Sequence, residues 1–218
     1  MPRALVTGGN RGIGYAMAEG LRARGVEVVI GVRDAQAGAA AAAGIACDWV
    51  HLDLEAPETF APAIADAGEI DILINNAGIL IEDSMIAHPE GLRRSMQVMF
   101  HAPFELILLC LPHMARAGGG RIINVSSGWG AFDEGLEGPG GYGVAKAALN
   151  AMSHALPRDL PAGVSINAMC PGWVHTRMGG QAAPRTPEEG ADTAIWLALD
   201  APAHLTGKFF RDRQEKAW

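Results

Sequence analysis

Tyr142 and Lys146 stand four residues apart in the segment Tyr142-Gly143-Val144-Ala145-Lys146. In a helix, residues i and i+4 share one face, so this spacing places the lysine ammonium beside the phenol. A free tyrosine has a pKa of about 10, and a fixed positive charge nearby favours the phenolate. We therefore expect Lys146 to lower the pKa of Tyr142, which can then act as a general acid or base. The spacing alone is equally typical of an ordinary solvated helix face.

A glycine-rich loop near the start of the chain is the second candidate for chemistry. Its glycines permit a tight turn and the close approach of a pyrophosphate, and the helix that follows offers free N–H groups and the positive end of its dipole. At the start of an alternating α/β chain, this pattern predicts dinucleotide binding. The predicted binding residues of the loop are Gly8, Asn10, Arg11, Gly12, Ile13 and Gly14.

Alternating strands and helices are predicted to position these residues. Short β-branched and apolar runs alternate with longer runs rich in alanine and leucine, a pattern typical of a parallel sheet with helices on both faces. The 218 residues, 49% of them hydrophobic, predict one α/β domain over residues 1–218. The predicted strands are Ala4–Thr7, Glu27–Val32, Trp49–Leu52, Ile70–Asn75, Arg121–Ser126, Val164–Ala168 and Lys208–Phe210.

Composition excludes several classes of partner. The net charge of −7 argues against nucleic acid and against an anionic membrane surface, because both are bound by clustered lysine and arginine. Three widely spaced cysteines indicate reduced thiols in the cytoplasm, and the scattered histidines predict no metal site. The longest apolar run, Leu106 to Leu111, is too short to span a membrane, and the first strand begins too early to follow a cleaved signal peptide.

The end of the second predicted strand indicates which dinucleotide binds. In such folds the residue about 20 positions after the glycines selects between a ribose hydroxyl and a 2′-phosphate. Val32 stands there instead of a carboxylate, and Arg33 follows it. Together with Arg11, Arg33 offers charge-assisted hydrogen bonds of about 1.5–3 kcal/mol each to a 2′-phosphate, which favours NADP(H). Asp34 leaves the alternative open, since a strand ending later would bring its carboxylate to the ribose.

Six short motifs follow one another along the chain: Thr7-Gly8-x-x-x-Gly12-x-Gly14, Leu52-Asp53-Leu54, Asn75-Asn76-Ala77-Gly78, Ile123-Asn124-Val125-Ser126-Ser127, Tyr142-x-x-x-Lys146 and Pro171-Gly172-Trp173-Val174-x-Thr176. In this order they resemble the short-chain dehydrogenase/reductase family, from Leu5 to about Phe210. The resemblance implies a doubly wound Rossmann sheet of seven parallel strands in the order 3-2-1-4-5-6-7. The segment Thr206 to Arg213 most resembles the NADPH-dependent carbonyl reductases of the family.

The resemblance also implies a reaction, hydride transfer between a nicotinamide and a carbonyl or alcohol substrate. Tyr142 would exchange the proton, Lys146 would hold the cofactor ribose, and Ser127 would hydrogen-bond the substrate oxygen, with Ser126 as a close rival. The interval from Ser127 to Tyr142 is slightly longer than is usual, and the Gly135–Gly141 loop can absorb the difference. The further cofactor-binding residues implied are Asp53 at the adenine, Leu54 through its main chain, Asn75, Ala77 and Gly78 on the ribose side, Pro171, Gly172, Val174, and Thr176 at the carboxamide.

One functional position departs from the family. Relatives usually carry an asparagine where this chain has Met99, and the main-chain carbonyl of that residue holds a water that connects the lysine to solvent. Pro103 lies four residues further on and has no N–H to donate to the carbonyl at i−4. We therefore expect the Met99 carbonyl to stay available. The alternative is an impaired relay and low turnover.

Two other functions stay open at this point. An NADPH-binding sensor or scaffold could keep the fold and lose the chemistry, because a fold does not determine a function. Binding alone, however, would not require Ser127, Tyr142 and Lys146 together. A methyltransferase on a similar sheet would not need the tyrosine and lysine pair.

The substrate itself is not predicted, but two surfaces are. Trp129, Phe132, Trp173 and Met178 flank the motifs and could line an apolar pocket or belong to the core. In relatives, the helices that correspond to Pro103–Ala115 and Tyr142–Leu156 pair in dimers or tetramers. A homodimer or homotetramer is therefore expected.

Overall fold

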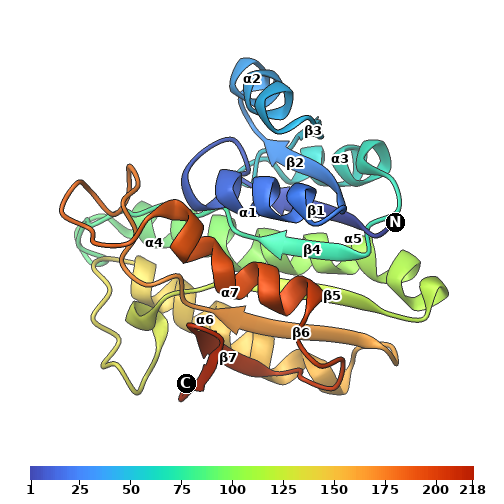
Figure 1. The fold of residues 1–218 in the computed structure, drawn as a ribbon. Helices are drawn as coiled ribbons and strands as arrows, with labels where there is room; N and C mark the ends of the chain where they lie inside the picture. The colour runs from blue at the N-terminus through green and yellow to red at the C-terminus, as the bar shows by residue number, and fades with distance from the viewer.

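A twisted eight-stranded sheet with helices on both faces forms the body of the protein in the computed structural model, which describes residues 1–218 (Figure 1). The strands lie in the order β3-β2-β1-β4-β5-β6-β7-β8, and all neighbours are parallel except β7 and β8. Their bounds are β1 Arg3–Thr7, β2 Glu27–Val32, β3 Asp48–His51, β4 Ile72–Asn75, β5 Gly120–Val125, β6 Val164–Met169, β7 Lys208–Arg211 and β8 Gln214–Lys216.

The first seven strands confirm the predicted order, and their bounds differ from the predicted ones by at most two residues. The prediction of seven strands was incomplete, because β8 adds an antiparallel edge. The turn before β8 is formed by Asp212 and Arg213, which both have positive φ angles of 54° and 59°. Turns of this kind usually contain glycine or asparagine. All three residues of β8 are polar and exposed, so no apolar alternation marks it in the sequence.

Helices cover both faces of the sheet, and each face has its own hydrophobic core. The alternation of side chains along a strand explains this arrangement: in β1, Ala4 and Val6 point into one core and Leu5 into the other. On the first face lie α1 Gly12–Ala23, α2 Ala35–Ile45 and α7 Pro187–Leu199, and on the second lie α3 Phe60–Ala67, α4 Pro89–Met96, α5 Ala102–Ala117 and α6 Tyr142–Ala155.

The longest helical run extends from Pro89 to Ala117, through α4, a π-helical turn at Gln97–His101 and α5. This run is long enough to cross a membrane, with a mean hydropathy of 1.5, although its longest uninterrupted apolar segment is short. Much of its apolar surface is buried against the sheet, including Leu106 and Ile107 in the second core. It is therefore a core helix of the α/β domain.

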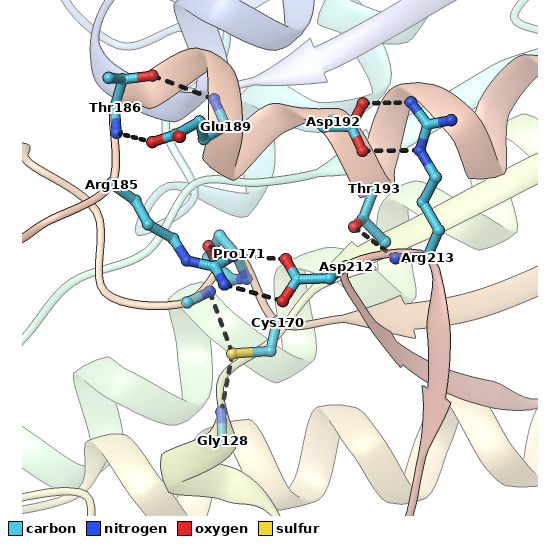
Figure 2. Close-up of polar contacts among 11 residues, drawn as sticks. Gly128, Cys170, Pro171, Arg185, Thr186, Glu189, Asp192, Thr193, Asp212 and Arg213 are labelled. Carbon is cyan, nitrogen blue, oxygen red and sulfur yellow. Dashed lines mark hydrogen bonds and ion pairs between the residues drawn. The ribbon is translucent and has the colours of Figure 1, made fainter.

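The start of α7 has the capping arrangement that its sequence indicates. The Thr186 hydroxyl accepts a hydrogen bond from the Glu189 N–H at 3.2 Å, and the Glu189 carboxylate accepts one from the Thr186 N–H at 2.8 Å (Figure 2). Such a capping box satisfies two N–H groups that the helix leaves free. It fixes where the long loop after β6 ends.

A third, small core closes the far end of the sheet. Phe209 of β7 is completely buried and stacks on the Trp218 ring, with 5.6 Å between ring centres. Ala131, which lies in the loop after β5, belongs to the same cluster, and the Trp218 carbonyl accepts a hydrogen bond from the Asp133 N–H. The carboxyl-terminal residues therefore hold the loop after β5 in place.

We expect Phe209→Ala to lower the free energy of unfolding by about 3–5 kcal/mol, because it removes a buried aromatic ring and leaves a cavity. Phe132→Ala is the matched control: its side chain is 71% exposed, so its change should stay within about 0.5 kcal/mol. Urea unfolding monitored by circular dichroism measures both. Equal losses in the two variants would contradict the assignment of Phe209 to the core.

Candidate active site

The predicted site residues lie at the carboxyl ends of the parallel strands from β3 to β6, which form one edge of the sheet. The loops that follow β4, β5 and β6 gather at this edge, on the left in Figure 1. The chain reverses its direction of winding between β1 and β4, and ligands of open α/β sheets bind outside such a switch point. The loops deliver Gly8, Asn10, Arg11, Gly12, Ile13 and Gly14 after β1, Arg33 after β2, Asp53 and Leu54 after β3, Asn75, Ala77 and Gly78 at the end of β4, Ser127 after β5, and Pro171, Gly172, Val174 and Thr176 after β6.

Tyr142 and Lys146 occupy the first two turns of α6, which packs beside the end of β5. The Lys146 Nζ lies 5.8 Å from the centre of the Tyr142 ring and donates a hydrogen bond to the Val125 carbonyl at 2.6 Å. Both side chains are buried. The helical spacing read from the sequence therefore brings the amine and the phenol together.

The electrostatics differ from the expectation that Lys146 lowers the pKa of Tyr142. Burial raises the pKa of Tyr142 to about 12, and an interaction with the Ser127 hydroxyl opposes this rise. Burial also lowers the pKa of Lys146 to about 8. Removal of each charged form from water dominates both shifts, as it commonly does for buried groups. The phenol is therefore protonated at neutral pH.

The backbone of the turn after β5 lies directly against α6, which allows this helix to pack close to β5. A Cβ atom on Gly130, in the short 3-10 turn Gly128–Gly130, would lie only 2.7 Å from the Lys146 carbonyl carbon. Any larger residue would therefore push the helix away. The Asn150 side chain strengthens this contact by donating to the Gly130 carbonyl at 3.0 Å.

Two adjacent serines follow β5 and face in opposite directions. Ser126 is buried, and its hydroxyl lies 3.5 Å from the Lys146 carbonyl, on the protein side. Ser127 is partly exposed, adopts an extended backbone and accepts a hydrogen bond from the Trp129 N–H at 3.2 Å. Of the two candidates, Ser127 is the one whose hydroxyl is open to the edge of the sheet.

A buried polar chain supports the strands below the site. The Asn75 amide donates to Asn124 at 2.9 Å, Asn124 donates to Ser153 at 2.9 Å, and Ser153 donates to the Leu149 carbonyl within α6. The Asn75 side chain therefore points into the protein.

The glycine loop and the start of α1 fit a phosphate-bearing ligand. No side chain caps the first turn of α1, and the turn contains no acidic residue, so its free N–H groups stay available to an anion. A Cβ atom on Gly14 would collide with the Asn76 amide and the Gly8 carbonyl. Only glycine therefore lets the start of α1 pack this closely against the glycine loop and the end of β4. An anion that lies close to the main chain matches such a surface.

The two residues after β2, whose roles the sequence left open, have different partners in the structure. Asp34 is the N-cap of α2, and its carboxylate accepts a hydrogen bond from the Ala37 N–H at 2.9 Å. Arg33 is exposed, with only a loose ion pair of 3.6 Å to Glu55. The carboxylate therefore caps the helix, and the exposed guanidinium has only this loose partner.

Met99 lies beside Lys146, at the position where the family has its asparagine. A Cβ atom on Gly78 would lie 3.4 Å from the Met99 sulfur and 3.8 Å from the Lys146 Nζ. Met99 sits in the π-helical turn, where the Ala102 N–H donates to the Gln97 carbonyl five residues earlier. The helix is thus distorted where Pro103 withholds its N–H, as the sequence leads us to expect.

Sequence reasoning missed the contacts that hold the loop after β6. The Cys170 sulfur accepts hydrogen bonds from the Gly128 and Gly172 N–H groups, at 3.3 and 3.4 Å (Figure 2). Arg185 forms a two-fold ion pair with Asp212, in the turn between β7 and β8. Gly128 lies 42 residues from Cys170, and Arg185 lies 27 residues from Asp212. None of these four residues belongs to a motif, so nothing in the sequence marks the two contacts.

The four large apolar residues near the motifs are exposed at the surface, which excludes the core as their place. Trp129 makes an edge contact with the Tyr142 ring, with 6.1 Å between ring centres. Trp173 is 56% exposed and donates its indole N–H to the Gly179 carbonyl. Together, Trp129, Phe132, Trp173 and Met178 expose apolar surface on the loops after β5 and β6.

Comparisons with known proteins agree with this geometry. The profile of the family described as short chain dehydrogenase matches residues 2–186. Carbonyl reductase (NADPH) 1 of Mus musculus is 29% identical, over 100% of this chain and 98% of that protein. The 3-oxoacyl-(acyl-carrier-protein) reductase FabG of Escherichia coli is 31% identical, over 94% of this chain and 93% of that protein. A solved short chain dehydrogenase/reductase family protein is similar with a TM-score of 0.88 at 32% identity, over 96% of this chain and 94% of its own.

The lowered pKa of Lys146 predicts a pH dependence of stability. The folded protein releases this proton near pH 8, whereas the unfolded chain keeps it until about pH 10.5. Between these values the unfolded state binds more protons, so stability rises with pH. The free energy of unfolding of the unmodified protein, minus that of Lys146→Met, should increase by about 3 kcal/mol across this range.

Urea unfolding at a series of pH values measures this difference. The exposed Lys216 supplies the control, because Lys216→Met removes an amine that stays in water, and the same difference should then be flat. A flat difference for Lys146→Met as well would show that its amine is not desolvated.

Proposed function

The chain belongs to the short-chain dehydrogenase family of oxidoreductases, and on this basis we propose that it is an NADP(H)-dependent reductase of carbonyl compounds. One observation carries the proposal: a buried phenol and a buried amine lie beside an outward-facing serine at the edge where the glycine loop offers its N–H groups. A binding protein has no need of that phenol. An enzyme that moves a proton to a carbonyl oxygen does.

The protonation state of Tyr142 favours reduction. With a pKa raised to about 12, the phenol carries its proton at neutral pH and can donate it at once to a substrate oxygen that gains negative charge. Ser127 donates a hydrogen bond to the same oxygen, and such a pre-aimed donor stabilises the transition state more than the ground state. When bound, NADPH supplies the hydride.

Lys146 serves the same site in two ways. One of its N–H groups is held by the Val125 carbonyl, which fixes the amine and leaves two donors for the hydroxyls of the nicotinamide ribose. Its pKa of about 8 lets the amine gain or lose a proton near neutral pH, so it can return a proton to Tyr142 after each turnover. Because Pro103 has no N–H to donate to the Met99 carbonyl, this carbonyl is the acceptor we propose for a water on that path.

The preference for NADP(H) rests on Arg11 and Arg33. Two guanidiniums suit the 2′-phosphate, and the Asp34 carboxylate, which would suit a ribose hydroxyl, caps α2 instead. Asp53, predicted at the adenine, lies after β3 and orders its loop by accepting from the Glu55 N–H.

The surroundings of the phenol favour an apolar substrate. Trp129, Phe132, Trp173 and Met178 expose large apolar surface on the loops after β5 and β6. Aldehydes and ketones with aromatic or aliphatic substituents would bury this surface on binding. Large exposed side chains on α5 and α6, Leu108 and Val144, support a homodimer or homotetramer, and we propose a cytoplasmic location.

Tyr142→Phe tests the proposed chemistry. We expect kcat to fall by at least about 10²-fold, since the variant lacks the proton donor, while NADPH affinity changes little. Loss of NADPH absorbance with a panel of simple aldehydes and ketones measures turnover. Tyr15→Phe, at the only other tyrosine, should leave kcat unchanged.

Two results would contradict the proposal. Near-full turnover by Tyr142→Phe would refute its role. Tight NADPH binding by the unmodified protein, without turnover of any carbonyl in the panel, would favour the alternative of a sensor or scaffold, with Met99 as the departure that accounts for it.

The cofactor preference gives a further prediction. The kcat/KM of the protein should be higher with NADPH than with NADH, and Arg33→Ala should reduce that ratio by about tenfold or more. Asp34→Ala is the control: it removes the cap of α2, which costs about 1 kcal/mol of stability, but should leave the ratio unchanged. If Asp34→Ala instead harms only the reaction with NADH, its carboxylate binds the ribose and the preference is refuted.

A further inference from the structure

Arg177 has no role in the motifs described above, yet it is one of few arginines without a partner. Most arginines of this acidic protein are paired, for example Arg24 with Asp200 and Arg213 with Asp192. Arg11 and Arg177 make neither an ion pair nor a side-chain hydrogen bond. A protein with a net charge of −7 has carboxylates to spare, so two unpaired guanidiniums at one place indicate a site for an anion.

Backbone contact brings these two arginines together. Arg11 directly precedes Gly12, the first residue of α1, and Arg177 directly follows Thr176. A Cβ atom on Gly12 would lie 3.2 Å from the Thr176 methyl group, so the two segments touch at this point. The pKa of Arg11 is lowered by burial and then by the charges of Arg177 and Arg33, so Arg11 lies near enough to both guanidiniums to be repelled by them. Repulsion of this kind is relieved when an anion lies between the groups.

The segment that carries Arg177 is held at both ends. The Thr176 hydroxyl accepts from the Gly179 N–H at 3.1 Å, and the Thr176 carbonyl accepts from the Gly180 N–H at 2.8 Å. The His175 N–H donates to the Arg185 carbonyl at 2.8 Å, and Arg185 is anchored to Asp212 (Figure 2). The backbone of Arg177 is thus ordered before any ligand arrives, which lowers the entropic cost of binding through its side chain.

We propose that Arg177 binds the diphosphate of the cofactor at the start of α1. The assignment rests on the proposed function, and it concerns the diphosphate because Arg177 lies beside the first turn of α1, where free N–H groups await an anion. Arg33 stands at the other end of this group, after β2, next to the 2′-phosphate. Arg11 lies between them, coupled to both.

Isothermal titration calorimetry with Arg177→Ala and three probes tests this assignment. NADP⁺ and NAD⁺ share the diphosphate, whereas adenosine 2′-monophosphate has only the 2′-phosphate. We expect Arg177→Ala to weaken NADP⁺ and NAD⁺ binding by the same factor, about 10- to 100-fold, and to leave binding of adenosine 2′-monophosphate unchanged. Arg33→Ala should instead weaken NADP⁺ and adenosine 2′-monophosphate and spare NAD⁺.

Arg116→Ala is the matched control, because it removes an exposed guanidinium at the end of α5, before β5 and so at the opposite edge of the sheet. It should change none of the three affinities. Thermal unfolding of Arg177→Ala close to that of the unmodified protein shows that the fold is kept.

Two results would overturn the assignment: unchanged NADP⁺ and NAD⁺ affinities in Arg177→Ala, or a loss confined to NADP⁺ and adenosine 2′-monophosphate, which would place Arg177 at the 2′-phosphate. Failure of the proposed cofactor preference is distinguished from failure of this assignment by the affinities of the unmodified protein for NAD⁺ and NADP⁺. If that protein binds NAD⁺ as tightly as NADP⁺, the cofactor preference fails, but an equal weakening of both by Arg177→Ala still supports the role of Arg177.

Discussion

The hydrogen bond from Lys146 to the Val125 carbonyl ties the candidate chemistry to the fold. Val125 is the last residue of β5, and the two serines follow it directly, so the bond that orders the amine also sets α6 against the serine turn. The close contact at Gly130 is what lets the lysine reach this carbonyl. A small displacement of α6 would separate the amine, the phenol and Ser127 together, because one interface positions all three.

Burial shifts the two titrating groups in opposite directions, and both shifts suit a reductase. Desolvation opposes the phenolate of Tyr142 and the ammonium of Lys146, so it keeps a proton on the phenol and loosens the one on the amine. A buried amine destabilises the fold at neutral pH, and sites of this kind are typical of positions selected for activity. The two hydrophobic cores on either side of the sheet supply the stability that the site does not.

Local patterns were sufficient to predict the first seven strands and the α/β class, whereas the order of the strands came from the family resemblance. The alternation along β1, with Ala4 and Val6 on one side and Leu5 on the other, is a property of neighbouring residues, as is the capping box at Thr186. The strand β8 escaped prediction because its residues are exposed and its turn contains no glycine. The same limit applies to Cys170 and the ion pair of Arg185 with Asp212, whose partners meet only through the order of the sheet.

The proximity of Tyr142 and Lys146 was predictable from the sequence, and the direction of their pKa shifts was not. The spacing of Tyr142 and Lys146 gives their proximity, but the direction of each pKa shift depends on how much water the packed loops exclude, and sequence does not encode that locally. Charge likewise could be predicted for the whole chain but not for its local distribution. A net charge of −7 argues against a polyanionic partner, yet Arg11, Arg33 and Arg177, from three different loops, gather where the strands end. Because carboxylates pair most other arginines, this excess of positive charge is local, and it suits the small anion of the proposed cofactor site better than an extended nucleic-acid backbone.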